Sequence, residues 1–310
     1  MPVTVITGTT TGIGRSTAIH LARHGHRVVA TMRDVSRAQG LRRRAAEEGL
    51  DVEILPLDVD DDVSVVRAFA RIHEVHGRVD VLVNNAGVSD IGTVEDATLA
   101  RWKAVFETNL FGVVRCCQAV LPGMRERRSG KIVNVSSVAG RMASVGQAAY
   151  SASKFALEGF SELLANEVAP FDIGVCIVEP GVTVTPIFSK HTKAPPGSAY
   201  GQVYERMFAL YASLLEKASR PEAIAEVIFE AITSEAPRLR WPAGDDAQAL
   251  LAARMAMSDD QWLQLGTPEQ NAYRRFFAMY FNVELRLGEM GAEGRAQSTE
   301  TSPRELEGPQ

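Results

Sequence analysis

The sequence predicts an α/β fold in which a parallel sheet is covered by helices on both faces. Through roughly the first 245 residues, short runs rich in β-branched residues alternate with amphipathic segments of helix length. The short runs are apolar with little alternation, as expected of strands that are buried on both faces. Because a strand–helix–strand rhythm implies right-handed crossovers, we predict a doubly wound parallel sheet.

Seven runs are expected to form the strands, within one domain that covers residues 1–245. They span residues 3–7, 27–33, 52–58, 79–85, 131–137, 174–180 and 238–241.

A helical extension is predicted next, at residues 246–287. Five aromatic residues at helical spacing give it one apolar stripe: Tyr273, Phe276, Phe277, Tyr280 and Phe281. We expect this stripe to pack on the body of the protein or on a second subunit, with a membrane-surface helix as the alternative. The tail at 288–310 has no aromatic residue, and we expect it to be disordered.

The bulk composition is that of a globular protein, with 45% apolar and 23% charged residues in a chain of 310. The net charge of −5 argues against a nucleic-acid-binding surface, which needs a basic face. The three cysteines lack metal-binding spacing and are expected to be reduced thiols. No signal-sequence pattern and no run of about 18 apolar residues is present, so we expect a cytoplasmic protein without a membrane span.

A glycine-rich segment at residues 7–14, TGTTTGIG, lies where the first strand should turn into a helix. Glycines there permit a tight turn and let the backbone approach a pyrophosphate, which the N–H groups and positive dipole of the helix N-terminus would bind. We therefore predict a Rossmann-like dinucleotide-binding domain. Its phosphate-binding residues would be Gly8, Thr10, Thr11, Gly12, Ile13 and Gly14.

The end of the second predicted strand bears on the choice of dinucleotide. An acidic side chain at this point suits the 2′-hydroxyl of NAD, whereas an arginine suits the 2′-phosphate of NADP. The sequence has Arg33 and then Asp34, and Arg33 ends the predicted strand. We predict a preference for NADP(H), with NAD(H) as the alternative coenzyme; a solvated, non-binding Arg33 is the structural alternative.

Further motifs follow in a fixed order along the chain. They are NNAG at 84–87, Asn109 in ETNLFG, Ser137 in NVSS, Tyr150-x-x-x-Lys154 and PGVTVT at 180–185. Together with the glycine-rich segment, they resemble the motifs of the short-chain dehydrogenase/reductase family over about residues 3 to 245. The VVATMRD segment and the long C-terminal region resemble the steroid- and retinol-type branch of that family. Members of the family are often dimers or tetramers, so a homodimer or homotetramer is expected.

The resemblance assigns catalysis to Asn109, Ser137, Tyr150 and Lys154. A tyrosine with a pKa of about 10 is a poor base at neutral pH, but a lysine ammonium one helical turn away, together with an oxidised nicotinamide, would favour the phenolate. Ser137 would hydrogen-bond the substrate oxygen, and Asn109 resembles the family residue that holds a water relaying protons to the lysine. Tyr150 and Lys154 are also expected to contact the cofactor.

Other cofactor contacts are implied only by the resemblance. Asp58 with Val59 would contact the adenine, and Asn85, Ala86 and Gly87 would lie along the adenosine ribose. The alternatives are a strand-end cap for Asp58 and a purely structural turn for NNAG. The segment near the nicotinamide would contribute Pro180, Gly181, Thr183 and Thr185.

The region at 186–215 is predicted to be a lid over the substrate, because a Pro-Gly-Ser stretch precedes a helical pattern. One face of that helix would carry Tyr204, Met207, Phe208, Tyr211 and Leu215, which border an apolar substrate pocket or form core.

No metal site is predicted, because His20 and His24 have no evident third ligand. The sequence thus predicts an NADP(H)-dependent oxidoreductase that interconverts a carbonyl and a primary or secondary alcohol on a medium-sized, mostly apolar substrate. A nucleotide-binding sensor or scaffold without turnover is the alternative.

Overall fold

A computed structural model describes residues 1–186, 195–285 and 287. Seven parallel strands form one sheet in the order β3-β2-β1-β4-β5-β6-β7. The strands are β1 (Val3–Ile6), β2 (Arg27–Met32), β3 (Val52–Pro56), β4 (Val81–Asn84), β5 (Gly130–Val135), β6 (Ile173–Pro180) and β7 (Arg240–Ala243). The predicted doubly wound sheet is confirmed, and the predicted strand boundaries differ from the observed ones by at most two residues.

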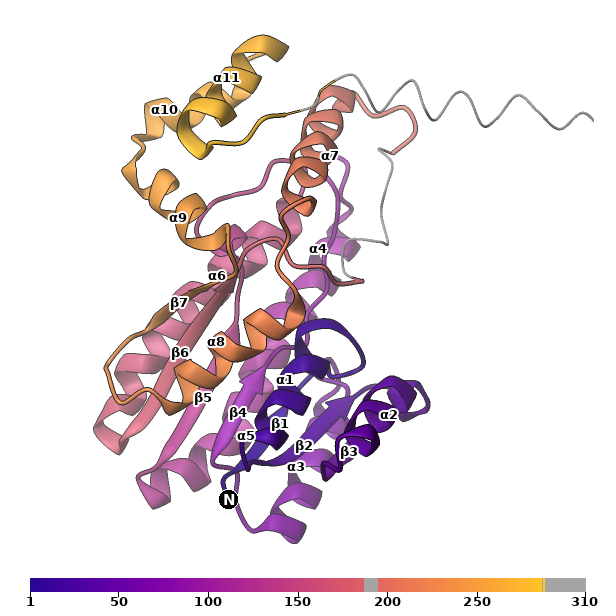
Figure 1. The fold of residues 1–310 in the computed structure, drawn as a ribbon, viewed down its shortest axis with the longest axis vertical. Helices are drawn as coiled ribbons and strands as arrows, with labels where there is room; N and C mark the ends of the chain where they lie inside the picture. Colours follow the sequence, from indigo (N-terminus) through magenta and orange to yellow (C-terminus); the bar gives the residue numbers. More distant parts are fainter. Residues whose placement is uncertain (187–194, 286, 288–310) are drawn as a thin grey trace, which may run out of the picture.

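Helices cover both faces of the sheet (Figure 1). The α-helices are α1 (Gly12–Arg23), α2 (Gln39–Glu47), α3 (Asp62–His76), α4 (Leu99–Phe106), α5 (Gly112–Arg127), α6 (Ala148–Val168), α7 (Gly201–Leu215), α8 (Pro221–Thr233), α9 (Ala247–Ala256), α10 (Asp259–Leu263) and α11 (Gln270–Phe281). Short turns of other helix types are η1 (Val35–Ala38), η2 (Glu107–Phe111), η3 (Val138–Gly140), η4 (Ala169–Phe171) and η5 (Gln264–Gly266).

Neighbouring residues of the central strands enter two different cores. Val5 of β1, for example, packs with α3, α5 and α6, whereas the adjacent Ile6 packs with α1, α2 and α8. Because successive side chains of a strand point to opposite faces, strands that are buried on both sides must be apolar throughout. This explains why the predicted strands show little polar alternation.

The order of the strands reverses between β1 and β4, which are neighbours although two other strands lie between them in the sequence. In open α/β sheets, ligands bind beyond the carboxyl ends of the strands at such a reversal. The chain segments that follow β1, β4, β5 and β6 therefore converge on one region, below α7 and α9 in Figure 1.

The C-terminal helices form a third core above the sheet (Figure 1). Tyr273, Phe276, Phe277 and Phe281 are buried there, and Tyr280 packs against them, together with residues of α7 and α9. The aromatic stripe thus packs on the body of the protein, as the first of the sequence-based alternatives proposed.

Two predicted segments lie partly or wholly outside the described residues. The tail at 288–310 is one, and residues 187–194 of the predicted lid are the other. The described second half of that region contains α7. Whether the region acts as a lid stays a prediction.

By length and composition alone, one helical stretch, Leu99–Arg127, is apolar enough to cross a membrane. Its residues Cys116, Cys117, Val120 and Met124 are buried in the core formed with α3 and α6. A core helix meets the same criteria of length and composition.

Candidate active site

A cavity of about 490 Å³ lies at the carboxyl ends of the central strands. Every residue that the sequence predicted to bind the cofactor lines this cavity, together with Ser137. The predicted residues are Gly8, Thr10, Thr11, Gly12, Ile13, Gly14, Arg33, Asp58, Val59, Asn85, Ala86, Gly87, Tyr150, Lys154, Pro180, Gly181, Thr183 and Thr185. The structure brings them together, and their roles toward a cofactor stay predictions.

The glycine-rich turn lies close to the end of β4. Gly8 has φ of +72°, and a Cβ atom there would lie 2.7 Å from Cα of Ala86. Gly8 is therefore required both by its backbone conformation and by the close approach of the neighbouring chain. Asn85 holds the same turn, since its side-chain amide donates to the carbonyl oxygens of Thr7 (2.8 Å) and Gly8 (3.1 Å). The NNAG segment thus has the structural role that was proposed as an alternative.

The donors at the start of α1 fit a bound diphosphate. Its N-cap residue Thr11 makes no side-chain capping bond, and no acidic residue occupies the first turn. The backbone N–H groups at the start of a helix have no intrahelical partner, and the helix dipole gives this end a partial positive charge. Residues 12–14 therefore present suitable donors for an anion where the cavity meets the helix.

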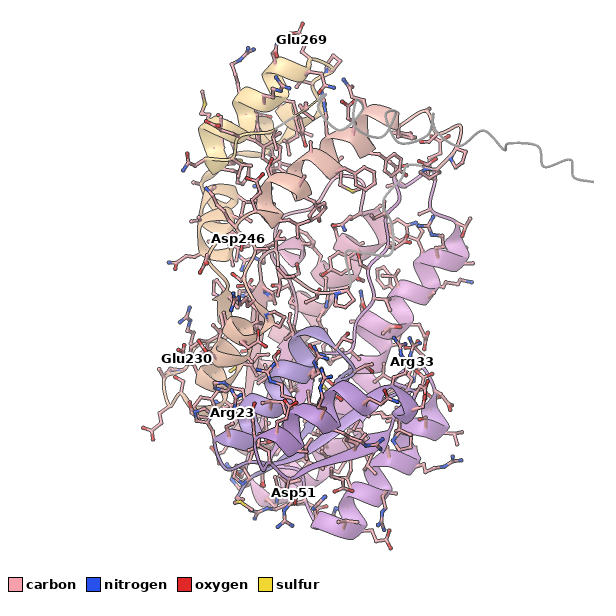
Figure 2. All side chains as sticks on the ribbon, turned by 45° about the vertical axis from the view of Figure 1, so that its right-hand side comes forward. Arg23, Arg33, Asp51, Glu230, Asp246 and Glu269 are labelled. Atoms are coloured by element: carbon pink, nitrogen blue, oxygen red, sulfur yellow. The ribbon has the colours of Figure 1, made fainter. Side chains whose placement is uncertain are left out.

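The structure also places charged side chains where β2 ends. Arg33 and Arg37 line the cavity, and neither side chain has an ion-pair partner among the described residues. Asp34 also lines it, but its carboxylate accepts from the backbone N–H (3.0 Å) and the hydroxyl (2.6 Å) of Ser36 as the N-cap of η1. The Ser36 hydrogen bonds lower the pKa of Asp34. In the view of Figure 2, Arg33 lies toward the right of the molecule and Asp246 toward the left.

Several residues of this cavity were missed by the sequence analysis. Arg37, Asp60, Thr108 and Ser136 line it as well. The carboxylate of Asp60 accepts from the Thr108 hydroxyl at 2.9 Å, and burial raises the pKa of Asp60. For Arg37, the sequence offered one signal, its position four residues after the predicted cofactor contact Arg33.

Asp58 contributes to the local turn after β3. Its side chain accepts a hydrogen bond from the backbone N–H of Asp60 at 3.2 Å. This agrees with the alternative prediction, in which Asp58 caps the end of the strand. It still lines the cavity.

Asn109 is fully buried behind the cavity, in the single π-helical turn η2. Its side-chain amide accepts from the N–H of Val88 (2.8 Å) and donates to the carbonyl oxygen of Val88 (2.9 Å) and to the Ser153 hydroxyl (3.0 Å). Asn109 therefore ties the loop after β4 to α6, beside Tyr150 and Lys154. π-Helical turns occur frequently at functional sites.

Tyr150 and Lys154 lie one turn apart on α6, with the ammonium 5.9 Å from the ring centroid of the tyrosine. Lys154 Nζ donates to the carbonyl oxygen of Val135 at 2.9 Å. Burial raises the pKa of Tyr150, and a hydrogen bond with Ser137 opposes that effect. The expected lowering of the pKa of Tyr150 by Lys154 together with an oxidised nicotinamide stays a prediction.

Ser137 follows β5 and adopts extended backbone angles as the N-cap of η3. Its hydroxyl accepts from the N–H of Ala139 at 3.1 Å and donates to the carbonyl oxygen of Pro180 at 3.5 Å. The residue therefore stands between the ends of β5 and β6, beside Tyr150.

A second, mainly apolar cavity adjoins the first one. It shares Ser89, Ser137, Tyr150 and Gly181 with the larger cavity. Its remaining lining residues are Val138, Ala139, Met142, Ser144, Gln147, Val182, Leu210, Tyr211, Leu214 and Leu250. Tyr150 and Ser137 therefore stand at the wall common to both cavities.

Both alternatives proposed for the apolar face of α7, pocket wall and core, occur in the structure. Of the five residues predicted on that face, only Tyr211 lines the cavity, whereas Tyr204 and Met207 are buried elsewhere. The Tyr204 hydroxyl donates to Asp96 at 2.7 Å, so this tyrosine is part of the core. Periodicity identified an apolar face of the helix, but not which part of that face meets the site.

The C-terminal extension also contributes to the site. Leu250 of α9 lines the apolar cavity, and a carboxylate oxygen of Asp246 accepts from the N–H of Val182 at 2.9 Å. A Cβ atom at Gly181 would lie 1.8 Å from the other carboxylate oxygen of Asp246. The start of α9 therefore lies directly against the segment after β6.

No group of three or more metal-ligating side chains occurs among the described residues. The rings of His20 and His24 stack at 4.4 Å between centroids, and both contact Phe229.

Comparison with known proteins identifies the family. The family model for short chain dehydrogenases matches residues 2–196. The chain belongs to the short-chain dehydrogenase/reductase family. It is therefore an oxidoreductase of a family that binds nicotinamide cofactors.

Some of the relatives belong to the retinol-type branch, which the sequence was found to resemble. A 3-ketodihydrosphingosine reductase of Bacteroides thetaiotaomicron is 37% identical over 281 residues, which cover 89% of this chain and 98% of the relative. Retinol dehydrogenase 8 of Bos taurus is 41% identical over 249 residues, covering 76% of this chain and 79% of the relative. A metagenomic short-chain oxidoreductase solved with NADP has a TM-score of 0.63 and 29% identity, and the match covers 77% and 95% of the two chains.

Proposed function

We propose that this protein is an NADP(H)-dependent oxidoreductase that interconverts a carbonyl and a primary or secondary alcohol on a mostly apolar substrate, with Tyr150 as the general acid and base. The observation that carries the proposal is the position of Tyr150 and Ser137 at the wall shared by the two cavities. A group that exchanges a proton with the substrate while hydride is transferred must reach both sites.

The preference for NADP(H) rests on the charges at the end of β2. Arg33 and Arg37, which form no ion pair within the described part of the chain, offer cations to a phosphate, whereas the carboxylate of Asp34 is held by Ser36. An arginine guanidinium binds phosphate oxygens well, and a carboxylate there would repel them. The related oxidoreductase solved with NADP is consistent with this choice.

The chain's own residues account for the proton chemistry. Bound NADPH would supply the hydride. Burial raises the pKa of Tyr150, so this phenol holds its proton at neutral pH and can donate it to a carbonyl oxygen that becomes an alkoxide. Ser137 would orient that oxygen from the cavity wall that it shares with Tyr150. Lys154 would add positive charge that favours the phenolate left after transfer.

The second cavity indicates the character of the substrate. Its walls beyond the shared residues are mainly aliphatic, including Met142, Leu210, Leu214 and Leu250. Such walls favour apolar groups through the hydrophobic effect. Among the relatives, one is named as the reductase of a keto compound and another as the dehydrogenase of an alcohol, retinol.

The experiment that tests this function follows NADPH oxidation at 340 nm against a panel of aliphatic, aromatic and cyclic ketones. We expect ketone-dependent oxidation that is faster with apolar substrates, and the reverse reaction with the matching alcohols and NADP. Tight NADPH binding without turnover of any ketone, aldehyde or alcohol would instead identify a nucleotide-binding sensor or scaffold.

A further inference from the structure

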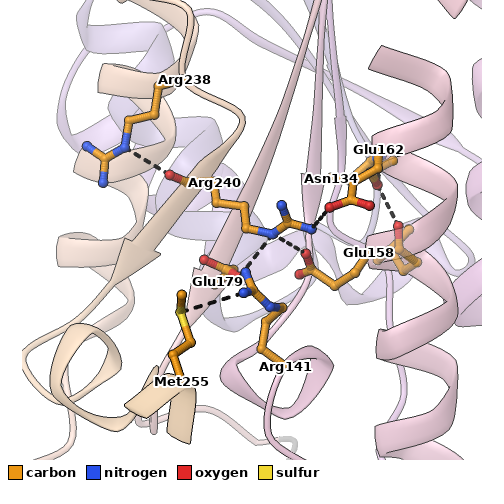
Figure 3. A network of polar contacts seen from close by, with 10 residues as sticks. Asn134, Arg141, Glu158, Glu162, Glu179, Arg238, Arg240 and Met255 are labelled. Atoms are coloured by element: carbon orange, nitrogen blue, oxygen red, sulfur yellow. Dashed lines mark hydrogen bonds and ion pairs between the residues drawn. The ribbon is translucent and has the colours of Figure 1, made fainter. Parts of the chain in front are cut away.

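A partly buried network of charged side chains lies against the middle of α6 (Figure 3). Glu158 and Glu179 are almost fully buried, with 4% and 1% of their surfaces exposed. The guanidinium of Arg240 contacts three carboxylates, those of Glu158 (3.0 Å), Glu162 (2.6 Å) and Glu179 (3.7 Å). Arg141 approaches Glu179 at 3.5 Å. The network thus joins α6, β6, β7 and the segment after η3.

This network is connected with Lys154 through the geometry of α6. Glu158 follows Lys154 by one helical turn, so both side chains lie on the same face. The ammonium of Lys154 is buried, and it donates a hydrogen bond to the neutral carbonyl oxygen of Val135. A buried ammonium without a nearby carboxylate would lose its proton readily.

The electrostatic effects agree with this geometry. Burial lowers the pKa of Lys154 to about 8, and Glu158 opposes this effect. Burial, together with repulsion from Glu158, raises the pKa of Glu179 to about 7, and Arg141 and Arg240 oppose that rise. The protonation state of each member therefore depends on its neighbours.

The charges of the cluster balance only when Lys154 is included. Above about pH 7, where Glu179 is ionised, the cations Lys154, Arg141 and Arg240 then match the carboxylates Glu158, Glu162 and Glu179. Without Glu158, the buried part of the cluster would carry excess positive charge beside Lys154. Buried charges are tolerated when they are paired, so the excess would be relieved by loss of the lysine proton.

We propose that Glu158, with its carboxylate fixed by Arg240, is a positioning residue that keeps Lys154 protonated at the nucleotide cavity. The inference rests on the proposed function in so far as Lys154 serves the nucleotide and Tyr150. Glu158 itself does not line either cavity. Its influence on the reaction therefore passes through Lys154.

Other titratable groups around this part of α6 enter the same balance. They are Tyr150 and Glu162 on α6, Arg141 after η3, Glu179 on β6, Arg240 on β7 and Tyr211 on α7. Among them, Glu162 offers a matched control. It pairs with the same arginine, but 52% of its side chain is exposed, so solvent screens its charge.

The test compares the wild type with Glu158→Gln, Glu162→Gln and Arg240→Gln between pH 6 and 10. NADPH affinity is measured by fluorescence titration, and kcat/KM by ketone reduction. Since Lys154 loses its charge as the pH rises through its pKa, both quantities should fall on the alkaline side in the wild type. We expect Glu158→Gln to move the midpoint of this fall to lower pH by about one unit. Glu162→Gln should leave the midpoint within about 0.3 units of the wild type.

Arg240→Gln separates an electrostatic role from loss of structure. Removing this cation leaves Glu158 as a stronger counter-charge for Lys154, so the midpoint should move to higher pH. Thermal unfolding at each pH verifies that the variants are folded. An unchanged midpoint in folded Glu158→Gln, or a shift in the same direction in both variants, overturns the inference. NADPH binding can show the two predicted shifts, to lower pH in Glu158→Gln and to higher pH in Arg240→Gln, while no ketone is reduced. In that case the proposed function fails and the role of Glu158 stands.

Discussion

The two sides of the active site are built in different ways. The nucleotide side uses short segments in which neighbouring residues act together, such as residues 7–14 after β1 and residues 85–87 after β4. The substrate side takes residues from widely separated segments, including Gln147 before α6, Tyr211 on α7 and Leu250 on α9. The two sides meet at Tyr150 and Ser137.

This difference matters for how each side recognises its ligand. Backbone N–H groups and tight glycine turns bind the parts that dinucleotides have in common, so the nucleotide side depends on backbone conformation. The substrate side depends on side-chain packing by α7 and the C-terminal extension. Substitutions should therefore affect one side while leaving the other intact, except at the shared wall.

The largest effect is expected at the shared wall. Tyr150→Phe removes the proton donor but keeps the ring, so kcat for ketone reduction should fall by about 1,000-fold or more. The dissociation constant for NADPH, measured by fluorescence, should change by less than about threefold. Tyr211→Phe is the matched control, because this tyrosine lines only the apolar cavity. Near-normal turnover in Tyr150→Phe would remove this residue from the mechanism.

The next effect tests the nucleotide side alone. Gly8 and Gly25 both have positive φ angles, of +72° and +79°, but only a Cβ atom at Gly8 would meet another chain segment. Gly25→Ala should cost about 1 kcal/mol of unfolding free energy from backbone strain and leave NADPH affinity unchanged. Gly8→Ala should also weaken NADPH binding by about 100-fold, because Ala86 must move. Equal NADPH affinities in the two variants would contradict a nucleotide site that depends on the close approach of Gly8 to Ala86.

A smaller effect is expected for the choice of coenzyme. Arg33→Ala removes a cation from the proposed 2′-phosphate site, so the KM for NADPH should rise by about 10- to 30-fold. The KM for NADH should change by less than about twofold. Arg27→Ala, at the other end of β2, should alter neither value. A similar rise for both coenzymes in Arg33→Ala would refute the assignment.

The smallest effect tests the substrate side. Leu250 and Leu251 are both buried on α9, but only Leu250 lines the apolar cavity. Replacing either leucine with alanine should lower the free energy of unfolding by about 2–4 kcal/mol. Leu250→Ala alone should raise the KM for apolar ketones, by about fivefold, without changing NADPH affinity. If Leu251→Ala changes the substrate KM as much, the cavity does not define the substrate site.

The sequence predicted the nucleotide side far better than the substrate side, for a physical reason. Strands buried on both faces must be apolar, and a phosphate-binding turn needs glycines at fixed spacing, so these features are encoded locally. The position of Leu250 depends on how the extension packs, and the contact between Glu158 and Arg240 joins residues 82 positions apart. Likewise, periodicity could not show that Tyr204 would bond to Asp96 rather than face the substrate.

Local sequence motifs also identified the reactive side chains, but they did not predict the surroundings of those side chains in the fold. The spacing of Tyr150 and Lys154 was evident, but the burial that raises the pKa of the phenol was not. η2 and β6, which are distant in the sequence, pack against α6 only in the folded chain.

Direct hydride transfer across the wall shared by the two cavities is the central claim. It is tested most directly with NADPH that carries deuterium at C4 of the nicotinamide on the transferred face, incubated with a reducible ketone. We predict an alcohol that contains one deuterium at the former carbonyl carbon, detected by mass spectrometry. An alcohol product without deuterium, from coenzyme labelled on either face, would contradict the account.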